Sequence, residues 1–295
     1  MSRIVSFLPA ATEITYAIGA GGDLVGRSHE CDYPEEVKRL PVVSKPALPV
    51  GEMSQEEIDR AVASHLASGE SLYQVDEVLL GQLDPDIVLT QDLCQVCAPS
   101  GNELGRALRE LPASPEVLWL TPRTLEEIKA NILEIGRATG RTAGADKVVA
   151  DFVARIAAVG EAVRGINPRR AVFLEWTEPP FCAGHWVPEM IAIAGGADSL
   201  GQFGTDSLRA TWDQVAAASP EIIVVAPCGY GLEQASLAAA SIPRISSARV
   251  FAVDANAYFA RPGPRVSEGI ELLAHLFHPD RVSWTQAHRP WAEVT

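Results

Sequence analysis

The chain is short of positive charge. Its 295 residues include 24 lysines and arginines against 38 aspartates and glutamates, so its formal net charge is −14. Nucleic acids and anionic membrane surfaces are bound by basic surfaces, so this balance argues against both as partners. We interpret the acidity itself as a property that keeps the protein in solution.

Long hydrophobic runs are also missing. No apolar stretch approaches the roughly 20 residues of a membrane-spanning helix, so we expect no membrane insertion. The N-terminal stretch 1–7 enters a predicted strand directly, without the charged, apolar and cleavage segments of a signal peptide. We therefore expect a cytoplasmic protein, or a periplasmic one if the sequence has been cropped. Five cysteines, an odd number, then indicate reduced thiols rather than a disulfide framework.

Familiar catalytic motifs are absent as well. The sequence contains no nucleophile elbow, no phosphate-cradling glycine loop and no HExxH pair of metal ligands. We accordingly expect a protein that is not an enzyme.

Strands and helices alternate through most of the chain, which predicts an α/β fold. The clearest strands of the first part are Ile4–Phe7, Leu24–Gly26, Asp86–Thr90 and Val117–Leu120. Helical patterns separate them, and Ser54 with Glu57 forms a capping box at the start of one helix. Such alternation is typical of a mostly parallel sheet covered by helices.

The middle of the chain differs, because residues 124–165 show helical spacing and almost no strand signal. Whether Gly140 and Gly144 join two helices or bend one stays open at this point. We predict an N-terminal lobe over residues 1–121, a helical connector over 122–167 and a C-terminal lobe over 168–295. Both lobes are expected to be Rossmann-like, with a ligand cleft between them.

Thiols and imidazoles follow the predicted strands. In an open α/β sheet, ligands bind beyond the carboxyl ends of the strands, so these side chains indicate a ligand site. The set comprises Cys31, Cys94, Cys97, Cys182, Cys228, His29 and His185.

The Cys94-x-x-Cys97 pair has three interpretations. A redox pair is expected at a helix N-terminus, but the next capping box opens at Ser100, three residues later. Zinc, iron or an iron–sulfur cluster would use the pair as half of its ligand set, with the other cysteines completing it. Small buried side chains are the third interpretation. We favour a metal or ligand role for the set as a whole.

The loop Cys182–Pro188 adds aromatic and metal-binding chemistry. Gly184 would let a ligand approach the backbone closely. Trp186 and Trp176 would stack on a flat ring system, and His185 would serve as an axial metal ligand. For Trp176, a place in the core is an equally good interpretation.

Taken in order, several stretches resemble the cobalamin-binding proteins of bacterial ABC importers. These stretches are Ile4–Glu13, Leu24–His29 with Asp32–Pro34, Asp84–Val88, Val172–Glu175 with Pro179–Phe181, Ser219–Val224, and Phe259 with Arg261, Pro264 and Arg265. The resemblance implies two lobes bridged by a long helix, a cobalamin or related corrinoid as the ligand, and an importer permease as a partner. Proteins of this kind dock through one acidic residue per lobe, and Glu77 and Asp213 fall near those positions, although both could be solvated helix charges.

The chain also departs from that family. The final loop, 256–260, carries alanine where the family has acidic residues, and residues 50–73 look like an insertion. On this basis we predict ligand contacts from His29, Tyr73, Asp92, Trp176, His185, Trp186, Tyr258 and Phe259. The alternative is a metalloprotein or metalloenzyme that holds a metal or iron–sulfur cluster in the same cleft, through the five cysteines together with His29 and His185.

Overall fold

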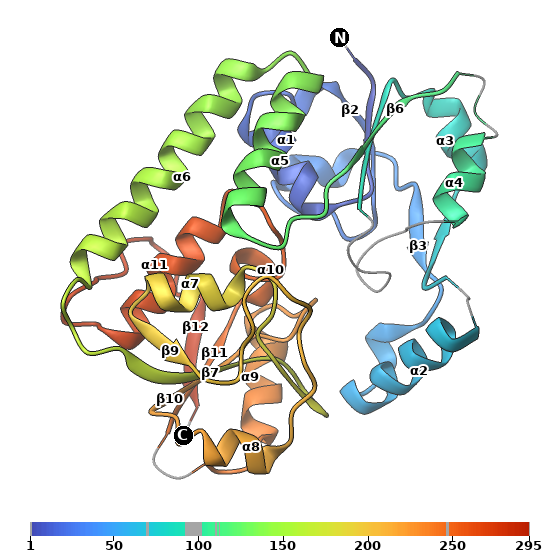
Figure 1. The fold of residues 1–295 in the computed structure, drawn as a ribbon. Coiled ribbons are helices and arrows are strands. Elements are labelled where there is room, and N and C mark those ends of the chain that lie inside the picture. The colour runs from blue at the N-terminus through green and yellow to red at the C-terminus, as the bar shows by residue number, and fades with distance from the viewer. Residues whose placement is uncertain are drawn as a thin grey trace. The chain divides into compact units, whose positions relative to one another are not determined.

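The structure is a computed structural model that describes residues 2–68, 71–91, 102–109, 111, 113–245 and 248–294. The chain divides into two compact units, which we describe separately. Unit 1 comprises Met1–Pro122 and Glu127–Val149, and unit 2 comprises Arg123–Glu126 and Ala150–Thr295. Both are built of parallel strands and helices, as Figure 1 shows, so the predicted α/β class is confirmed. No helix of the described ranges has the length and apolarity that a bilayer crossing demands.

Unit 1 contains a four-stranded parallel sheet in the order β2-β1-β5-β6. Its strands are β1 (Ile4–Ser6), β2 (Leu24–Arg27), β5 (Ile87–Thr90) and β6 (Glu116–Trp119). Its helices include α1 (Pro9–Ala17), α3 (Glu77–Leu83) and α4 (Asn102–Arg109). One core cluster joins the sheet to two of these helices, through Val5 and Val88 on the strands, Leu80 on α3 and Leu104 on α4. All four strands point their carboxyl ends the same way, so the loops that follow them share one edge of the sheet.

The stretch 50–73, which the sequence suggested is an insertion, joins the two strands of a small hairpin and contains a helix. Strands β3 (Ser44–Pro46) and β4 (Tyr73–Val75) pair antiparallel, and α2 (Gln55–Ser68) lies between them in the chain. The capping box at the start of α2 is confirmed, because the Ser54 N–H donates to Glu57 Oε2 at 2.8 Å. Strand β4 is followed directly by α3, which begins at Glu77. Unit 1 also contains short 3₁₀ turns over Gly21–Asp23, Glu35–Arg39 and Val50–Glu52.

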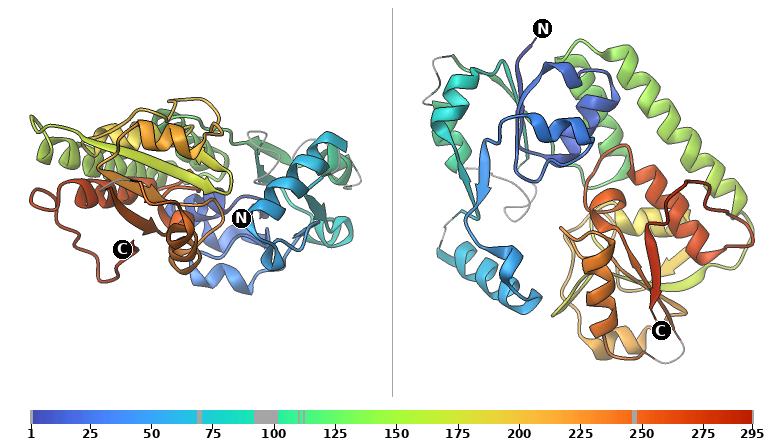
Figure 2. Two further views of the ribbon diagram at one scale, coloured as in Figure 1. Left: turned by 90° about the horizontal axis from the view of Figure 1, so that it is seen from below. Right: turned by 180° about the vertical axis from the view of Figure 1, so that it is seen from behind.

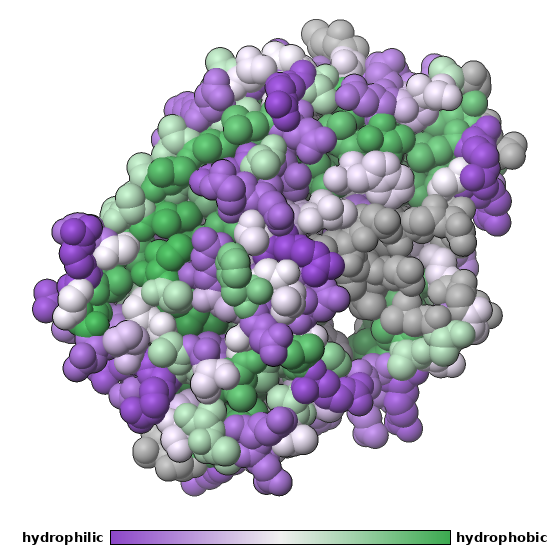
Figure 3. Space-filling view, viewed as in Figure 1, coloured by the Kyte–Doolittle hydropathy of each residue, from purple (hydrophilic) through white to green (hydrophobic). Residues whose placement is uncertain are grey.

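The middle of the chain forms two helices, α5 (Leu125–Ala138) and α6 (Thr142–Ala162). Gly140 between them adopts φ +68°, a left-handed conformation that glycine reaches without strain and that ends α5. The sequence left open whether this region joins or bends helices, and the structure shows a join. Figure 3 shows hydrophobic residues gathered along α6, where Val153 is 45% exposed.

Unit 2 contains a six-stranded sheet in the order β12-β11-β10-β7-β8, with β9 paired to β7. Its strands are β7 (Arg169–Thr177), β8 (Pro180–Cys182), β9 (Gly196–Asp198), β10 (Ile222–Val225), β11 (Arg249–Val253) and β12 (Trp291–Val294). The central strands β7, β10 and β11 are parallel, whereas β8 and β12 run antiparallel to their neighbours.

Helices cover both faces of this sheet, as the two views of Figure 2 show. They are α7 (Val187–Ile193), α8 (Trp212–Ala217), α9 (Leu232–Ser241), α10 (Ala255–Tyr258) and α11 (Val266–Phe277). Because strand side chains alternate between faces, Val172 and Leu174 pack with α9, whereas Phe173 faces the Phe259 ring that follows α10. The sheet is therefore buried on both faces.

Candidate functional site

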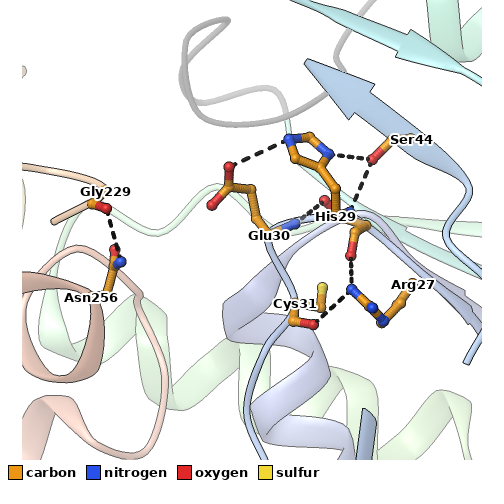
Figure 4. Close-up of polar contacts among 8 residues, drawn as sticks. Arg27, His29, Glu30, Cys31, Ser44, Gly229 and Asn256 are labelled. Carbon is orange, nitrogen blue, oxygen red and sulfur yellow. Dashed lines mark hydrogen bonds and ion pairs between the residues drawn. The ribbon is translucent and has the colours of Figure 1, made fainter. Parts of the chain in front are cut away.

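In unit 1, His29 lies just beyond the carboxyl end of β2, and its side chain is 18% exposed. Its Nδ1 lies 3.0 Å from the Ser44 hydroxyl at the start of β3. Its Nε2 lies 3.3 Å from Glu30 Oε1, without the geometry of a hydrogen bond. The Tyr73 ring at the start of β4 is 5.6 Å from the imidazole. Figure 4 shows the ring between Ser44 and Glu30, so side chains from both β3 and β4 lie next to this histidine.

Hydrogen bonds from Arg27 and Ser28 hold the backbone of the loop that carries His29. Arg27 donates from its guanidinium to the carbonyl oxygens of Ser28 and Cys31, at 3.1 Å each (Figure 4). The Ser28 N–H donates to the Ser6 carbonyl at 2.8 Å, which ties the loop to β1. With its backbone held in this way, the imidazole is preorganised rather than free to swing.

In unit 2, β7 extends past its parallel neighbour. The register pairs Leu174 with Val225, the last residue of β10, so Glu175 and Trp176 project beyond the carboxyl end of the parallel strands. The half-buried Trp176 ring lies 5.5 Å from the Tyr230 ring, which follows β10. Within the described residues, the buried Trp176 Nε1 has no hydrogen-bond partner. The pair presents aromatic surface where a planar ligand could stack.

The turn that carries Tyr230 is fixed by hydrogen bonds. The Tyr230 N–H donates to the Pro227 carbonyl at 3.0 Å, and the Asn256 side-chain amide donates to the Gly229 carbonyl at 3.0 Å (Figure 4). Gly229 itself adopts φ +85°, which a side chain would strain. Tyr230 is therefore placed by backbone geometry, and not only by packing of its ring.

His185 lies in the turn between β8 and α7, and its side chain is also 18% exposed. Its backbone adopts φ +52°, a left-handed conformation that is uncommon for histidine. Its Nε2 lies 3.3 Å from Asp206 Oδ1, and Arg123 Nη1 lies 3.0 Å from the same oxygen. Burial lowers the pKa of His185, and the Asp206 carboxylate partly opposes that shift.

Gly184 does permit a close approach, but by the protein and not by a ligand. A Cβ at this position would lie 2.4 Å from the backbone nitrogen of Ser207. The Gly184 N–H donates to Glu175 Oε1 at 3.0 Å, and the Ser207 hydroxyl donates to Glu175 Oε2. The glycine is thus needed to pack the segment 206–207 against this turn.

Three of the aromatic residues predicted to contact ligand lie in the interior of unit 2. Trp186, Tyr258 and Phe259 are 6%, 2% and 2% exposed. The Trp186 indole N–H donates to the Phe259 carbonyl at 3.0 Å, and the Tyr258 hydroxyl lies 2.7 Å from His288 Nε2. Their contacts favour a packing role, because each ring and polar atom already has a neighbour within the unit.

The cysteines do not form the expected cluster among the described residues. Cys31 is fully buried in unit 1, where the Thr12 hydroxyl lies 3.0 Å from its sulfur. Cys182 is the last residue of β8 rather than a loop residue, and it belongs to the core of unit 2. Burial, together with Asp198 and Glu175, raises its pKa to about 12, so the thiol stays protonated and is a poor metal ligand. Cys228 is exposed.

The metal interpretation therefore gains no support. Within the described ranges, no three histidine, cysteine, aspartate or glutamate side chains are grouped so that they could hold a metal ion. Cys94, Cys97 and Asp92 lie outside the described residues.

Sequence reasoning missed the residues that support the site. Ser44, Tyr230 and Asp206 were not among the predicted contacts. Tyr230 had a signal, since it follows a strand in the stretch Cys228–Gly231. Ser44 and Asp206 had none, because they meet their histidines only through folding.

Comparison with known proteins defines the class. The family model for periplasmic binding proteins matches residues 4–242, and the chain belongs to that family. Members of this family carry ligands without transforming them, so the protein is a solute-binding protein and not an enzyme.

Individual relatives span nearly the whole chain. A vitamin B12-binding protein of Vibrio cholerae is 25% identical over 92% of this chain and 87% of its own length. An uncharacterized ABC transporter substrate-binding lipoprotein of Bacillus subtilis, YvrC, is 26% identical over 94% of this chain and 80% of its own length.

Solved structures show the same fold. A periplasmic heme-binding protein from Pseudomonas aeruginosa superposes with a TM-score of 0.71 at 18% identity, covering 100% of this chain and 98% of that one. The periplasmic vitamin B12-binding protein of Vibrio cholerae does so with a TM-score of 0.64 at 22% identity, over 94% and 96%.

Proposed function

We propose that the protein binds a metal tetrapyrrole, with cobalamin or a related corrinoid as the first candidate, and serves as the substrate-binding component of an ABC importer. The family and the relatives named vitamin B12-binding protein support this function. The fold supports it less specifically, because similar structures include both heme-binding and B12-binding proteins.

The observation that carries the proposal is an imidazole near the carboxyl edge of the sheet in each unit. His29 and His185 both present a buried Nε2 that no hydrogen bond satisfies within the described residues. Such a nitrogen is suited to an axial bond with a metal, and the Trp176–Tyr230 pair adds a face on which a flat macrocycle can stack.

An iron porphyrin is the second candidate ligand. The His29 imidazole and the Tyr73 ring are neighbours at 5.6 Å, and imidazole and phenolate are both established haem ligands. Because corrinoid and porphyrin share a flat ring with a central metal, the two candidates make the same demands on the aromatic pair.

Titration of the purified protein with aquocobalamin, cyanocobalamin and hemin tests the proposal, with absorbance and calorimetry as readouts. We expect saturable binding of at least one of them. Trp176→Ala should weaken that binding, whereas Leu237→Ala, which removes a 68% exposed side chain on α9, should leave it unchanged. Absence of heat and of spectral change with all three ligands would reject the function.

The importer partner is a separate part of the proposal. Glu77, the first residue of α3, is paired with Arg106 at 2.9 Å, whereas Asp213 is exposed in the first turn of α8. A photo-crosslinking residue at position 213 should trap a multispanning permease in cells, and the same residue at position 237 should not. Equal yields at the two positions would contradict a docking role for Asp213.

A further inference from the structure

Trp176 carries a buried hydrogen-bond donor that the rest of unit 2 does not use. Its Nε1 is buried, and no described residue accepts a hydrogen bond from it. An indole has a single polar atom, and that atom can only donate. A buried donor without an acceptor costs free energy, and buried polar groups in folded proteins are nearly always paired. A ligand that brings an acceptor to this atom would recover that free energy.

Two other tryptophans of unit 2 show how an indole is satisfied within the protein. Trp186 Nε1 donates to the Phe259 carbonyl at 3.0 Å, and Trp284 Nε1 donates to the His288 carbonyl at 2.7 Å. Trp176 differs in its place, because it lies past the last residue of β10 that pairs with β7. This is the edge of an α/β sheet at which ligands bind.

Strand β7 is irregular immediately before Trp176. In its register with β8, Leu174 pairs with Cys182 and Trp176 pairs with Phe181, so Glu175 is one residue too many on β7. Such a β-bulge bends the strand and changes the direction of the side chain beside it, and bulges are common next to functional sites. The bulge therefore sets the direction of the Trp176 indole.

Glu175 is held through both its backbone and its side chain. Its carbonyl oxygen accepts from the Cys228 N–H at 3.1 Å. Its carboxylate accepts from the Gly184 N–H at 3.0 Å and from the Ser207 hydroxyl. These three donors belong to three different segments of unit 2, so the bulge has one defined shape. Glu175 thereby positions the tryptophan that follows it.

The chemistry of the donor indicates which part of a macrocycle it would recognise. The Nε1–H points outward in the plane of the indole, so a ring stacked on the indole meets it only through a substituent that leaves the ring plane. The peripheral carbons of a corrin are saturated, and their amide side chains project above and below the ring. Porphyrin substituents leave in the ring plane, and porphyrin carboxylates would also be repelled by Glu175 and by the net charge of −14.

We propose that the Trp176 Nε1–H donates a hydrogen bond to a carboxamide oxygen on the periphery of the ligand, and that this bond selects corrinoids over porphyrins. This inference rests on the proposed function, in which the Trp176–Tyr230 pair stacks on the macrocycle. Glu175 is the positioning residue. Because Nε1 is closed to water in the free protein, the indole turns about its side-chain bonds as the ligand stacks, while the bulge holds the backbone.

The test removes the donor and keeps the ring. Benzothienylalanine has sulfur in place of the indole N–H, and it is introduced at position 176 of the full chain. Dicyanocobinamide is the probe, because its two cyanides block the metal and leave the periphery to determine affinity. Trp176→benzothienylalanine should weaken its binding by about three- to tenfold in calorimetric titration. The same replacement at Trp284, whose donor is used within unit 2, should leave affinity unchanged.

Hemin is the second probe, since its periphery carries carboxylates and no amides. Wild-type protein should bind hemin more weakly than dicyanocobinamide, and the replacement at Trp176 should not weaken hemin binding further. Equal losses of affinity for the two probes would overturn the selection for amides.

The role of Glu175 has its own variants. Glu175→Ala should weaken dicyanocobinamide binding, and in that background the replacement at Trp176 should cause no further loss. Glu175→Gln keeps an oxygen that can accept from the Gly184 N–H, so it should restore both the affinity and its dependence on the indole N–H. A full loss from the Trp176 replacement in the Glu175→Ala background would contradict the positioning role.

The outcomes separate this inference from the proposed function. If wild-type protein binds no dicyanocobinamide, no cobalamin and no hemin, the proposed function fails. If Trp176→Ala weakens dicyanocobinamide binding but Trp176→benzothienylalanine does not, stacking on the ring stands and the hydrogen bond is overturned.

Discussion

His29 in unit 1 and His185 in unit 2 look alike at first. Each side chain is 18% exposed, and each Nε2 lies 3.3 Å from a carboxylate on an exposed residue. They differ in what holds them. Ser44 orients the His29 ring through Nδ1, whereas His185 is held mainly through its backbone, at φ +52°. Equal exposure therefore conceals different roles, and we expect His29 to be the better metal ligand.

The carboxylates of the two sites differ as well. Asp206, which faces His185, is 71% exposed and also pairs with the Arg123 guanidinium. Glu30 belongs to the same loop as its histidine. Asp206 and Arg123 therefore form a charge network that shifts the pKa of His185. The contact with Ser44 instead orients the His29 ring.

The largest expected effect comes from removing the ring beside His185. Trp186 is 6% exposed and lies 5.7 Å from the His185 ring, so Trp186→Ala should lower the free energy of unfolding by about 3–5 kcal/mol. Urea denaturation measures this. The matched control is Trp119→Ala in unit 1, at a tryptophan that is 43% exposed, which should cost less than about 1 kcal/mol. Similar losses for the two variants would contradict a core role for the Trp186 ring in unit 2.

The second-largest effect is expected on ligand affinity, which should differ between variants of the two histidines. Loss of an oriented metal ligand predicts a decrease of about 10- to 100-fold for His29→Ala with the ligand that titration identifies. His185→Asn should change affinity by less than about threefold, and asparagine tolerates the left-handed backbone at this position. Calorimetric titration of both variants measures these affinities. A larger loss in His185→Asn than in His29→Ala would place the metal ligand in unit 2.

The pH dependence of stability should come from His185. Burial lowers its pKa below the ordinary 6.5, so the unfolded chain takes up this proton at a higher pH than the folded protein does. The free energy of unfolding should therefore be fully retained above pH 6.5 and decline as the pH falls below it. Urea denaturation from pH 7.5 to 5 measures the decline, which should be shallower in His185→Asn. An unchanged profile in that variant would exclude His185 as the source.

The smallest effect is expected from Arg123. Its positive charge lowers the pKa of His185, so Arg123→Gln should raise that pKa, as followed by NMR titration of the imidazole. The pair it forms with Asp206 is exposed on both sides, at 42% and 71%, so stability should change by less than about 1 kcal/mol. A lower pKa of His185 in the variant would contradict the proposed charge network.

The fold could be predicted closely from the sequence. Continuous apolar strands such as Ile222–Val225 can only be buried on both faces, and a local capping box such as Ser54 with Glu57 marks a helix start without tertiary information. The short strands β3, β4, β8 and β9 were missed, since three residues carry too little periodicity to be recognised.

The candidate site was only partly predictable. The sequence alone placed His29 and His185 in loops that follow predicted strands, because the order of apolar runs and breaks determines which residues follow a strand. Only the tertiary structure decided that Trp186, Tyr258 and Phe259 pack inside unit 2, and that Ser44 reaches His29 across 15 residues. Periodicity tells which face of an element is apolar, but the partner of a side chain depends on segments that meet only when the chain has folded.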